Sequence, residues 1–230
     1  MNIAIIPARF GSKRIKNKNI KFFFGFPIIY WSLKKAKQSK LFKKIIVSTD
    51  NEKIANIAIK YGAEVPFIRP KKFSNDKVGI DEVMIHAIRS VKNLNPKYVC
   101  CINATAPFIS TKDLIAGFKK IKKNKFDYVF SAVKYDYPIQ RSFQLKKKKI
   151  KMIFPKFYKH NTQDLEENYH DAGQFYWGSS EAWLKKKRIF SKYSSTINIQ
   201  NHLAQDIDTI EDWKKAQLKY KILYQNEKKK

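Results

Sequence analysis

The sequence predicts an α/β fold built on a mixed, mostly parallel sheet. Short runs rich in Ile, Val and Ala alternate with stretches of helical periodicity along about the first two thirds of the chain, which is typical of βαβ units. The chain has 230 residues, 43% of them hydrophobic, enough to bury one substantial core. We therefore expect a single domain over 1–230, with an inserted arm at about 138–170.

The predicted elements follow one another in chain order. Strands are expected at 2–8, 44–48, 63–67, 98–102 and 128–133. Between them, helices are expected at 27–40, 52–61, 79–91 and 113–122. Asp50 can cap the second helix and Thr111 the fourth. Thr209 and Asp212 form a capping-box-like start for a C-terminal helix that runs to about Tyr224.

The alternation stops after Tyr137 and Pro138. Residues 144–150 are typical of a charged hairpin tip between two amphipathic extended segments, so this region is the candidate arm. Because a two-stranded arm is only marginally stable alone, we expect it to pack on the body or on a second subunit. Strand pattern resumes at 173–177, and the basic tail 227–230 is expected to be frayed.

The basic composition is a poor guide to function. There are 48 Lys and Arg against 19 Asp and Glu, a formal net charge of +29, which alone suggests nucleic acid or an anionic membrane. Lysine dominates, however, and is spread through the whole chain, whereas surfaces that read bases or clamp phosphates favour arginine. The charge therefore indicates a compositional bias, and we expect no specific nucleic-acid partner.

The cysteines and the apolar segments indicate a cytoplasmic protein with no membrane partner. Cys100 and Cys101 are adjacent on a predicted strand, so they point to opposite faces and are expected to be reduced core residues. The apolar stretch 22–31 is broken by Gly25 and Pro27, and neither a signal peptide nor a membrane span is predicted.

The first predicted strand leads into a basic loop. Side chains on such a loop lie at the carboxyl edge of the sheet, where ligands bind in open α/β folds. Arginine, lysine and free backbone N–H groups suit a polyphosphate, although a solvated basic loop is the ordinary alternative in so lysine-rich a chain. The candidate phosphate ligands are Arg9, Lys13, Lys18 and Asn19, with backbone donors at Gly11 and Ser12.

A pair of carboxylates near the C-terminus is the candidate metal site. Asp206 and Asp208 occupy positions i and i+2 of an extended segment and so project to the same side. Such a pair can hold Mg²⁺, which keeps several waters and shares substrate phosphates. Alternatively, Asp208 only supports the helix N-terminus beside Thr209.

Three further polar segments could complete the site. Residues 103–108 follow a predicted strand directly, Arg69 precedes a polar loop at 74–76, and residues 170–177 mix polar with aromatic groups that suit a sugar. The alternatives are an ordinary connection for 74–76 and a half-buried strand for 170–177. No nucleophile triad is visible, and nucleotidyl transfer needs none, because positioning and charge neutralisation supply most of the acceleration.

These segments together resemble the cytidylyltransferases that activate nonulosonic, sialic-acid-like sugars. Residues 6–20 are similar to the signature loop of that family, with Phe10 where the family often has glycine. The resemblance covers almost the full chain, through 47–50, 61–67, 69–70, 104–108 and 205–209. Residues 138–141, 163–166 and 170–177 resemble the pseudaminic acid branch rather than the N-acetylneuraminate branch.

The resemblance implies a Rossmann-like, three-layer nucleotide-diphospho-sugar transferase fold. It also implies a homodimer in which the arm of one subunit reaches the sugar pocket of the other. The implied reaction is attack of the sugar's anomeric hydroxyl on the α-phosphate of CTP, with pyrophosphate leaving and Mg²⁺ bridging the phosphates to Asp206 and Asp208. Legionaminic, N-acetylneuraminic and 3-deoxy-octulosonic acids are alternative substrates, and a non-catalytic polyanion-binding protein is the alternative of another class.

The resemblance assigns roles by position. Arg9, Lys13 and Lys18 would hold phosphates and stabilise the developing charge. The nucleotide-binding residues would be Ala8, Arg9, Gly11, Ser12, Lys13, Lys18, Asn19, Arg69, Asn103 and Thr105. The sugar-binding residues would be Gln140, Arg141, His170, Gln174 and Phe175.

Overall fold

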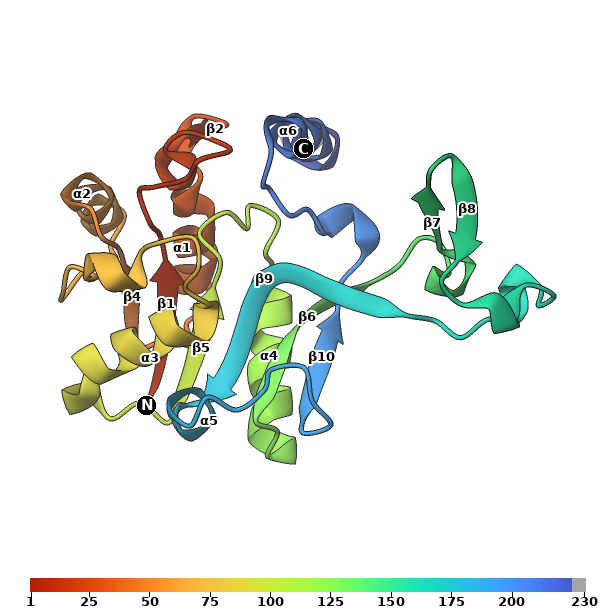
Figure 1. Ribbon diagram of the computed structural model, residues 1–230. Helices are drawn as coiled ribbons and strands as arrows, with labels where there is room; N and C mark the ends of the chain where they lie inside the picture. The colour runs from red at the N-terminus through yellow and green to blue at the C-terminus, as the bar shows by residue number, and fades with distance from the viewer. Residues whose placement is uncertain (225–230) are drawn as a thin grey trace.

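The centre of the fold is a twisted sheet with the strand order β10-β6-β9-β5-β1-β4 (Figure 1). The computed structural model describes residues 1–224, so the tail 227–230 lies outside the described residues. Within that range the sheet has six strands, of which β9 alone runs antiparallel to its neighbours. The strands are β1 (Asn2–Pro7), β4 (Lys44–Ser48), β5 (Tyr98–Ile102), β6 (Tyr128–Lys134), β9 (Tyr169–Ser179) and β10 (Ser194–Asn198).

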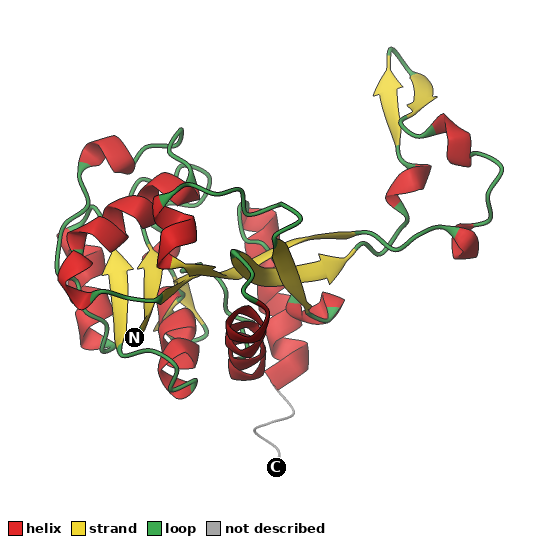
Figure 2. Ribbon diagram, turned by 90° about the horizontal axis from the view of Figure 1, so that it is seen from below, coloured by secondary structure: helices red, strands yellow, loops and turns green. Residues whose placement is uncertain are grey.

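Helices cover both faces of the sheet, which makes the three layers that were predicted (Figure 2). Each face has its own apolar core, and strand alternation divides the side chains between them. Cys100 faces the first core and Cys101 the second, and both are free thiols. The first core is covered by α1 (Ile29–Gln38), α2 (Glu52–Lys60) and α4 (Thr111–Asn124), and the second by α3 (Ile80–Ser90) and α5 (Ser180–Leu184).

One predicted strand is wrong. Residues 63–67 do not form a ladder; instead two isolated bridges join Glu64 to Ile46 and Ile68 to Thr49. Pro66 lies between the two bridges and has no N–H to donate, so continuous pairing with β4 is interrupted there.

Two predicted helix caps are each displaced by one residue. The side chain of Asn51, rather than that of Asp50, accepts hydrogen bonds from the first backbone N–H groups of α2. Likewise Ser110, rather than Thr111, caps α4 by accepting from the N–H of Asp113 at 3.1 Å. Both true caps have extended backbone, which the N-cap position requires, and their neighbours are side chains of similar chemistry.

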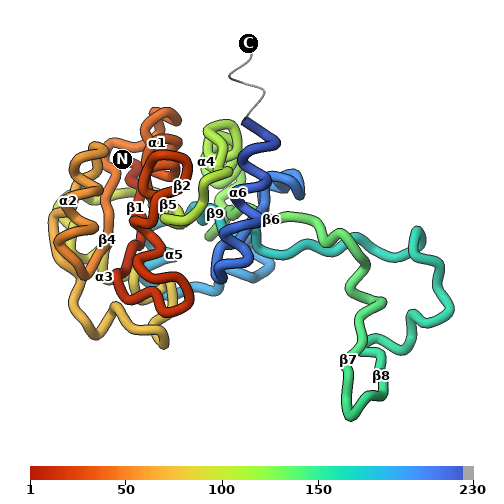
Figure 3. Tube along the Cα trace, turned by 90° about the horizontal axis from the view of Figure 1, so that it is seen from above, coloured from red at the N-terminus to blue at the C-terminus, as the bar shows by residue number. Residues whose placement is uncertain are grey.

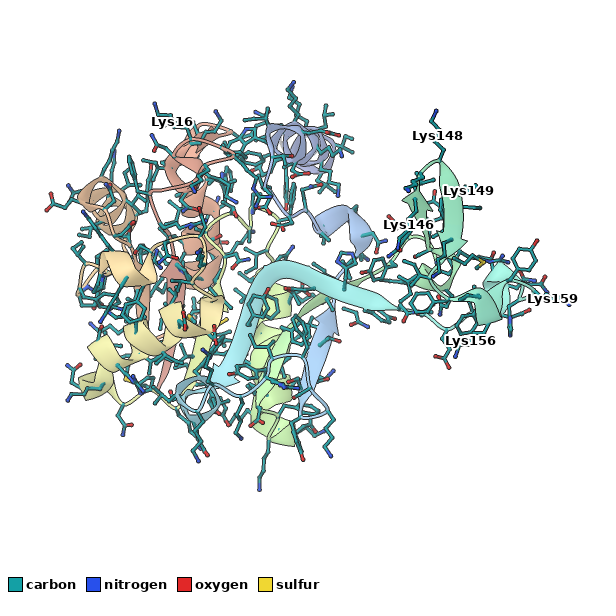
Figure 4. All side chains as sticks on the ribbon, in the orientation of Figure 1. Lys16, Lys146, Lys148, Lys149, Lys156 and Lys159 are labelled. Atoms are coloured by element: carbon teal, nitrogen blue, oxygen red, sulfur yellow. The ribbon has the colours of Figure 1, made fainter. Side chains whose placement is uncertain are left out.

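The segment between β6 and β9 projects from the body as an arm (Figures 1 and 3). It carries the predicted hairpin, formed by β7 (Phe143–Lys146) and β8 (Lys149–Met152). The two turn residues, Lys147 and Lys148, both have positive φ, as a tight hairpin turn of this twist requires. Figure 4 shows Lys148 at the tip of this hairpin, with Lys146 and Lys149 beside it.

The hairpin of the arm is amphipathic. Phe143 pairs with Met152 and Leu145 with Ile150, so these four apolar side chains share one face, while Gln144 and three lysines occupy the other. Leu145 is 72% exposed and Ile150 67% exposed, which leaves this face uncovered within the single chain. Residues 1–224 of the same chain do not cover this apolar face, so burying it would require a partner.

A third apolar cluster lies at the carboxyl edge of the sheet. There α6 (Ile210–Tyr224) packs through Trp213 against Ile15 of the opening loop and against Ile207. A small hairpin of β2 (Phe22–Phe23) and β3 (Phe26–Pro27) belongs to the same region. The cluster therefore holds the N-terminal loop against residues almost two hundred positions later.

Over residues 1–224, no helix combines the length and the apolar character that crossing a bilayer would need.

Candidate active site

A cavity of about 400 Å³ opens beyond the carboxyl ends of β1 and β5. Its walls come from the opening loop, the loop that follows Arg69, the segment after β5 and the extended segment before α6. This is the edge at which ligands bind in open α/β sheets. Most of the predicted nucleotide and metal residues line it: Arg9, Ser12, Lys13, Lys18, Asn19, Arg69, Asn103, Thr105, Asp206 and Asp208.

Two cations of the opening loop are paired with Asp76. Arg9 Nη1 lies 2.6 Å from one carboxylate oxygen of Asp76, and Lys13 Nζ lies 2.8 Å from the other. The backbone N–H of Phe10 between them donates to Asp50 at 2.9 Å, which fixes the start of the loop. Asp76 thus ties both candidates to the cavity wall, although the Lys13 side chain remains 82% exposed and that of Arg9 35%.

Two further cations of the opening loop are paired with Asp208. Arg14 Nη2 lies 2.7 Å from one of its oxygens and Lys18 Nζ 3.0 Å from the other. Lys18 also donates to the backbone carbonyl of Ile207 at 2.6 Å, and its side chain is only 19% exposed. Burial acts to raise the pKa of Asp208, but the hydrogen bond and charge of Lys18, helped by Arg14, bring this pKa below its ordinary value.

Asp206 has the opposite electrostatic environment. Its pKa is raised, first because the surrounding protein removes water from the carboxylate and second because the charge of Asp208 is close, while Lys18 only partly compensates. The residue still reaches solvent through the mouth of the cavity, so the carboxylate is accessible. The charge of Asp206 is thus only partly compensated, and a second carboxylate, that of Asp208, lies close to it. Such a pair of carboxylates suits a hard divalent cation, and Mg²⁺ accepts oxygen ligands of this kind. Among residues 1–224 no group of three or more metal-ligating side chains gathers, so a cation here would share its other ligands with water or phosphate.

Arg69 is the most deeply buried cation of the site. It is 3% exposed, and its Nε donates to Ser74 at 3.1 Å. Burial lowers its pKa from the ordinary value, Asp50 opposes this, and Arg9 adds to it. Its position next to another guanidinium in a cavity wall gives the site excess positive charge that an anionic ligand would neutralise.

Two asparagines of the predicted set use their side chains to build the site. Asn19 donates to the carbonyl of Arg9 at 2.8 Å, and Asn103 donates to the carbonyl of Gly173 at 2.7 Å. Gly173 has φ +63°, a conformation that favours glycine, which explains why strand β9 can bend at this point. Both asparagines line the cavity, but their amide nitrogens already have protein partners.

Ala8 and Gly11 do not line the cavity. Ala8 is fully buried, so its side chain belongs to the core. A Cβ added at Gly11 would meet no atom within 4 Å, so nothing in the protein itself requires glycine there. Phe10, at the position where the family often has glycine, is partly exposed and does not close the cavity.

The structure does not bring the predicted sugar-binding residues into this cavity. Phe175 is fully buried in the first core, because alternation along β9 turns it to the sheet face that α1, α2 and α4 cover. The prediction that this side chain contacts the sugar is therefore wrong. Gln174 is also buried and donates to the carbonyl of Leu203 at 2.7 Å. His170 stands further out on β9, its ring 4.7 Å from that of Tyr135.

Gln140 and Arg141 belong to the base of the arm. Gln140 donates to the carbonyl of Glu166 at 3.1 Å, and Arg141 donates to the carbonyls of Tyr158 and His160. Both side chains thus brace the arm's own loops, outside the cavity of the same chain.

Sequence reasoning passed over two charged residues of the cavity. Arg14 has no predicted role within the loop that is similar to the family signature, and Asp76 has none within the polar loop at 74–76. The available signal for Asp76 was an isolated carboxylate close after Arg69 in a chain poor in acidic residues. Its proximity to the opening loop depends on the fold, because the two are more than sixty positions apart.

The three-layer α/β fold, with its cavity at the carboxyl edge of the sheet, is shared by solved nucleotidyltransferases. Among solved structures, CMP:2-keto-3-deoxy-manno-octonic acid synthetase complexed with CTP superposes with a TM-score of 0.71 at 14% identity, covering 94% of this chain and 97% of that one. The 4-diphosphocytidyl-2C-methyl-D-erythritol synthase of Anaerococcus prevotii gives 0.63, also at 14% identity, with coverages of 94% and 96%.

The family model for cytidylyltransferase matches residues 3–229, so the chain belongs to the cytidylyltransferase family. It is 41% identical over 228 residues to the pseudaminic acid cytidylyltransferase of Campylobacter jejuni, covering 98% of each chain. It is 30% identical over 216 residues to the N-acylneuraminate cytidylyltransferase of Escherichia coli, covering 93% of this chain and 51% of that protein. These relatives confirm the family resemblance seen in the sequence.

Proposed function

We propose that this protein transfers the cytidylyl group of CTP to pseudaminic acid, giving the CMP-sugar and pyrophosphate. The observation that carries the proposal is the gathering of four loop cations and three aspartates in one cavity, in a chain 41% identical to a relative of that name. A cytoplasmic site of action is part of the proposal, because the reaction consumes CTP and both cysteines are free.

The chemistry needs no protein nucleophile. The anomeric oxygen of the sugar forms a bond to the α-phosphorus, the bond from that phosphorus to the bridging oxygen breaks, and pyrophosphate leaves with the electron pair. Arg9, Lys13 and Lys18, which all line the cavity, would hold the phosphates and neutralise the charge that develops on the leaving group. Arg69 adds a buried positive charge to the same wall.

Asp206 and Asp208 are the residues that would hold Mg²⁺. When bound there, the ion would supply further charge neutralisation and orient the phosphates. For that role Asp208 has to loosen its pairing with Arg14, which is 65% exposed and free to turn toward a phosphate.

The substrate assignment is tested with a panel of sugars. Purified protein is incubated with CTP, Mg²⁺ and each of pseudaminic, legionaminic, N-acetylneuraminic and 3-deoxy-octulosonic acid, and pyrophosphate release is followed. We expect kcat/KM for pseudaminic acid to exceed that for each other sugar by at least about tenfold, since buried polar groups discriminate strongly against mismatched hydroxyl and amide groups. A higher kcat/KM for another sugar would contradict the assignment, and no release with any of them would overturn the function.

The arm supports a homodimer as part of the same proposal. Its apolar hairpin face is uncovered, and Gln140 and Arg141 at its base lie outside the cavity of their own chain. A second copy that covers this face would bury the hairpin and bring the base of the arm toward the neighbouring sugar pocket. An isolated hairpin of this size would otherwise be marginal.

Light scattering checks the dimer. We expect a mass near twice 27.1 kDa for the wild type and a shift toward the monomer for the double variant Leu145→Asp, Ile150→Asp, because charges would replace the apolar face. Gln144→Asp is the control, since it puts a charge on the opposite face of the same strand. A monomeric wild type at micromolar concentration would refute the dimer.

A further inference from the structure

We infer that Asp76 is an internal stand-in for a phosphate group: it holds Arg9 and Lys13 in the cavity wall, and a nucleotide's polyphosphate has to displace it in order to bind. Asp76 thereby sets the affinity of the site for phosphates. The inference rests on the proposed function only in taking the opening loop as the phosphate-binding element.

The geometry of Asp76 resembles that of a bound phosphate. It uses both carboxylate oxygens, one toward the Arg9 guanidinium at 2.6 Å and the other toward the Lys13 ammonium at 2.8 Å. Two oxygens of a phosphate group would engage the same pair of cations in the same way. Asp76 itself lines the cavity, so it stands where such a group would enter.

Polyphosphate and Asp76 cannot both keep these contacts. The hydrogen bonds from Lys13 and Arg9 lower the pKa of Asp76, so the carboxylate is charged at neutral pH. A triphosphate brings several further negative charges to the same two cations, and like charges a few ångströms apart repel even at a partly solvated site. The ligand therefore gains the contacts to Arg9 and Lys13 only after their contacts to Asp76 are lost.

The loop around Asp76 allows this exchange without unfolding. Its first part is anchored, because Ser74 accepts from Arg69 at 3.1 Å and Asn75 donates to the carbonyl of Lys72 at 3.2 Å. Asn75 also accepts from the N–H of Lys77 at 2.9 Å, which closes a local turn around Asp76. Asp76 is 42% exposed in its side chain, so rotation toward solvent is open to it.

Calorimetric titration with inorganic triphosphate tests the inference. At one fixed ionic strength, we expect Asp76→Asn to bind inorganic triphosphate about three- to tenfold more tightly than the wild type. The reason is that triphosphate no longer has to break a partly exposed cluster of ion pairs when it binds the variant. Asp76→Glu keeps the carboxylate and is expected to restore the weaker, wild-type affinity. Cytidine, which has no phosphate, is expected to bind all three proteins equally.

A matched control removes the effect of net charge. Glu64→Gln also raises the net charge by one and also breaks a surface ion pair, that with Lys44 at 2.7 Å, but it lies beside the start of β4, at the opposite edge of the sheet. We expect its triphosphate affinity to stay within twofold of the wild type. Thermal unfolding of each variant confirms that it is folded.

The outcomes separate the inference from the proposed function. Equal or weaker binding of triphosphate by Asp76→Asn than by the wild type, or no binding by either, overturns the inference. Tighter binding by Asp76→Asn supports it even if no sugar in the panel is activated, because the titration contains neither sugar nor metal. The same increase in Glu64→Gln would also overturn it, since net charge alone would then account for the effect.

Discussion

Replacing Asp206 by asparagine is expected to lower kcat for pyrophosphate release by about 10²–10³-fold while leaving the protein folded and at least as stable as the wild type. The side chain keeps its size and can still accept the N–H of Ile207, a contact of 2.9 Å in the structure. What is lost is the negative charge that would hold Mg²⁺ together with Asp208. Initial rates at saturating CTP and sugar, over a range of Mg²⁺ concentrations, measure the effect.

The stability part of this prediction follows from the sign of the pKa shift. Because the pKa of Asp206 is raised in the folded state, folding favours its protonated form, and stability falls as the pH rises through the raised value. At neutral pH the charged carboxylate is therefore a cost, which asparagine removes. We expect a small rise in Tm at pH 7, worth less than about 1 kcal/mol because the group reaches solvent, and a smaller difference near pH 4.

Asp127→Asn is the control for Asp206→Asn. It removes one carboxylate charge as well, but from the ion pair with Lys187 at the start of β6, away from the cavity. Activity of this variant should match the wild type. Full activity of Asp206→Asn would contradict the metal role of this carboxylate.

Replacing Lys18 by methionine is expected to reduce both activity and stability. Lys18 joins the opening loop to the segment before α6, through Ile207 at 2.6 Å and Asp208 at 3.0 Å. Its loss removes a phosphate ligand and leaves a partly buried carbonyl without that donor. We expect kcat/KM to fall by about 10²-fold or more and the free energy of unfolding to fall by about 1–3 kcal/mol.

Lys16→Met is the matched control for Lys18→Met. Lys16 lies two positions earlier and is exposed, and Figure 4 shows its side chain at the outer surface of the molecule. Its replacement should leave rates and urea midpoints unchanged. Activity of Lys18→Met within threefold of the wild type would show that Lys18 does not hold the phosphates, whatever happened to stability.

Much of the site could be predicted because its parts are local in sequence. A strand followed by a basic loop predicts where Arg9 and Lys13 lie, and the spacing of Asp206 and Asp208 predicts that both face one side. The structure places all four in one cavity. Pairing across the fold was beyond sequence reasoning: the partners of Arg9 and Lys18 lie more than sixty and almost two hundred positions away.

The errors have equally local causes. The resemblance assigns Phe175 to the sugar by its position in the sequence. A strand exposes alternate side chains to opposite faces, however, and the place of Phe175 within β9 puts it in the core. Residues 63–67 have strand composition, yet Pro66 cannot extend a ladder. The helix caps were each one position off because neighbouring residues had equivalent capping chemistry.

The position of β9 also dictates the order in which the molecule can be assembled. β5 and β6 are made early on the ribosome, but each has β9 as its neighbour, and β9 follows only after the whole arm. Until then two strands present unpaired backbone edges, which is the condition under which nascent chains aggregate. The antiparallel strand that brings the carbonyl of Gly173 to Asn103 thus also joins β5 to β6, so neither of the two cores beside the sheet is complete until the chain beyond the arm has been made.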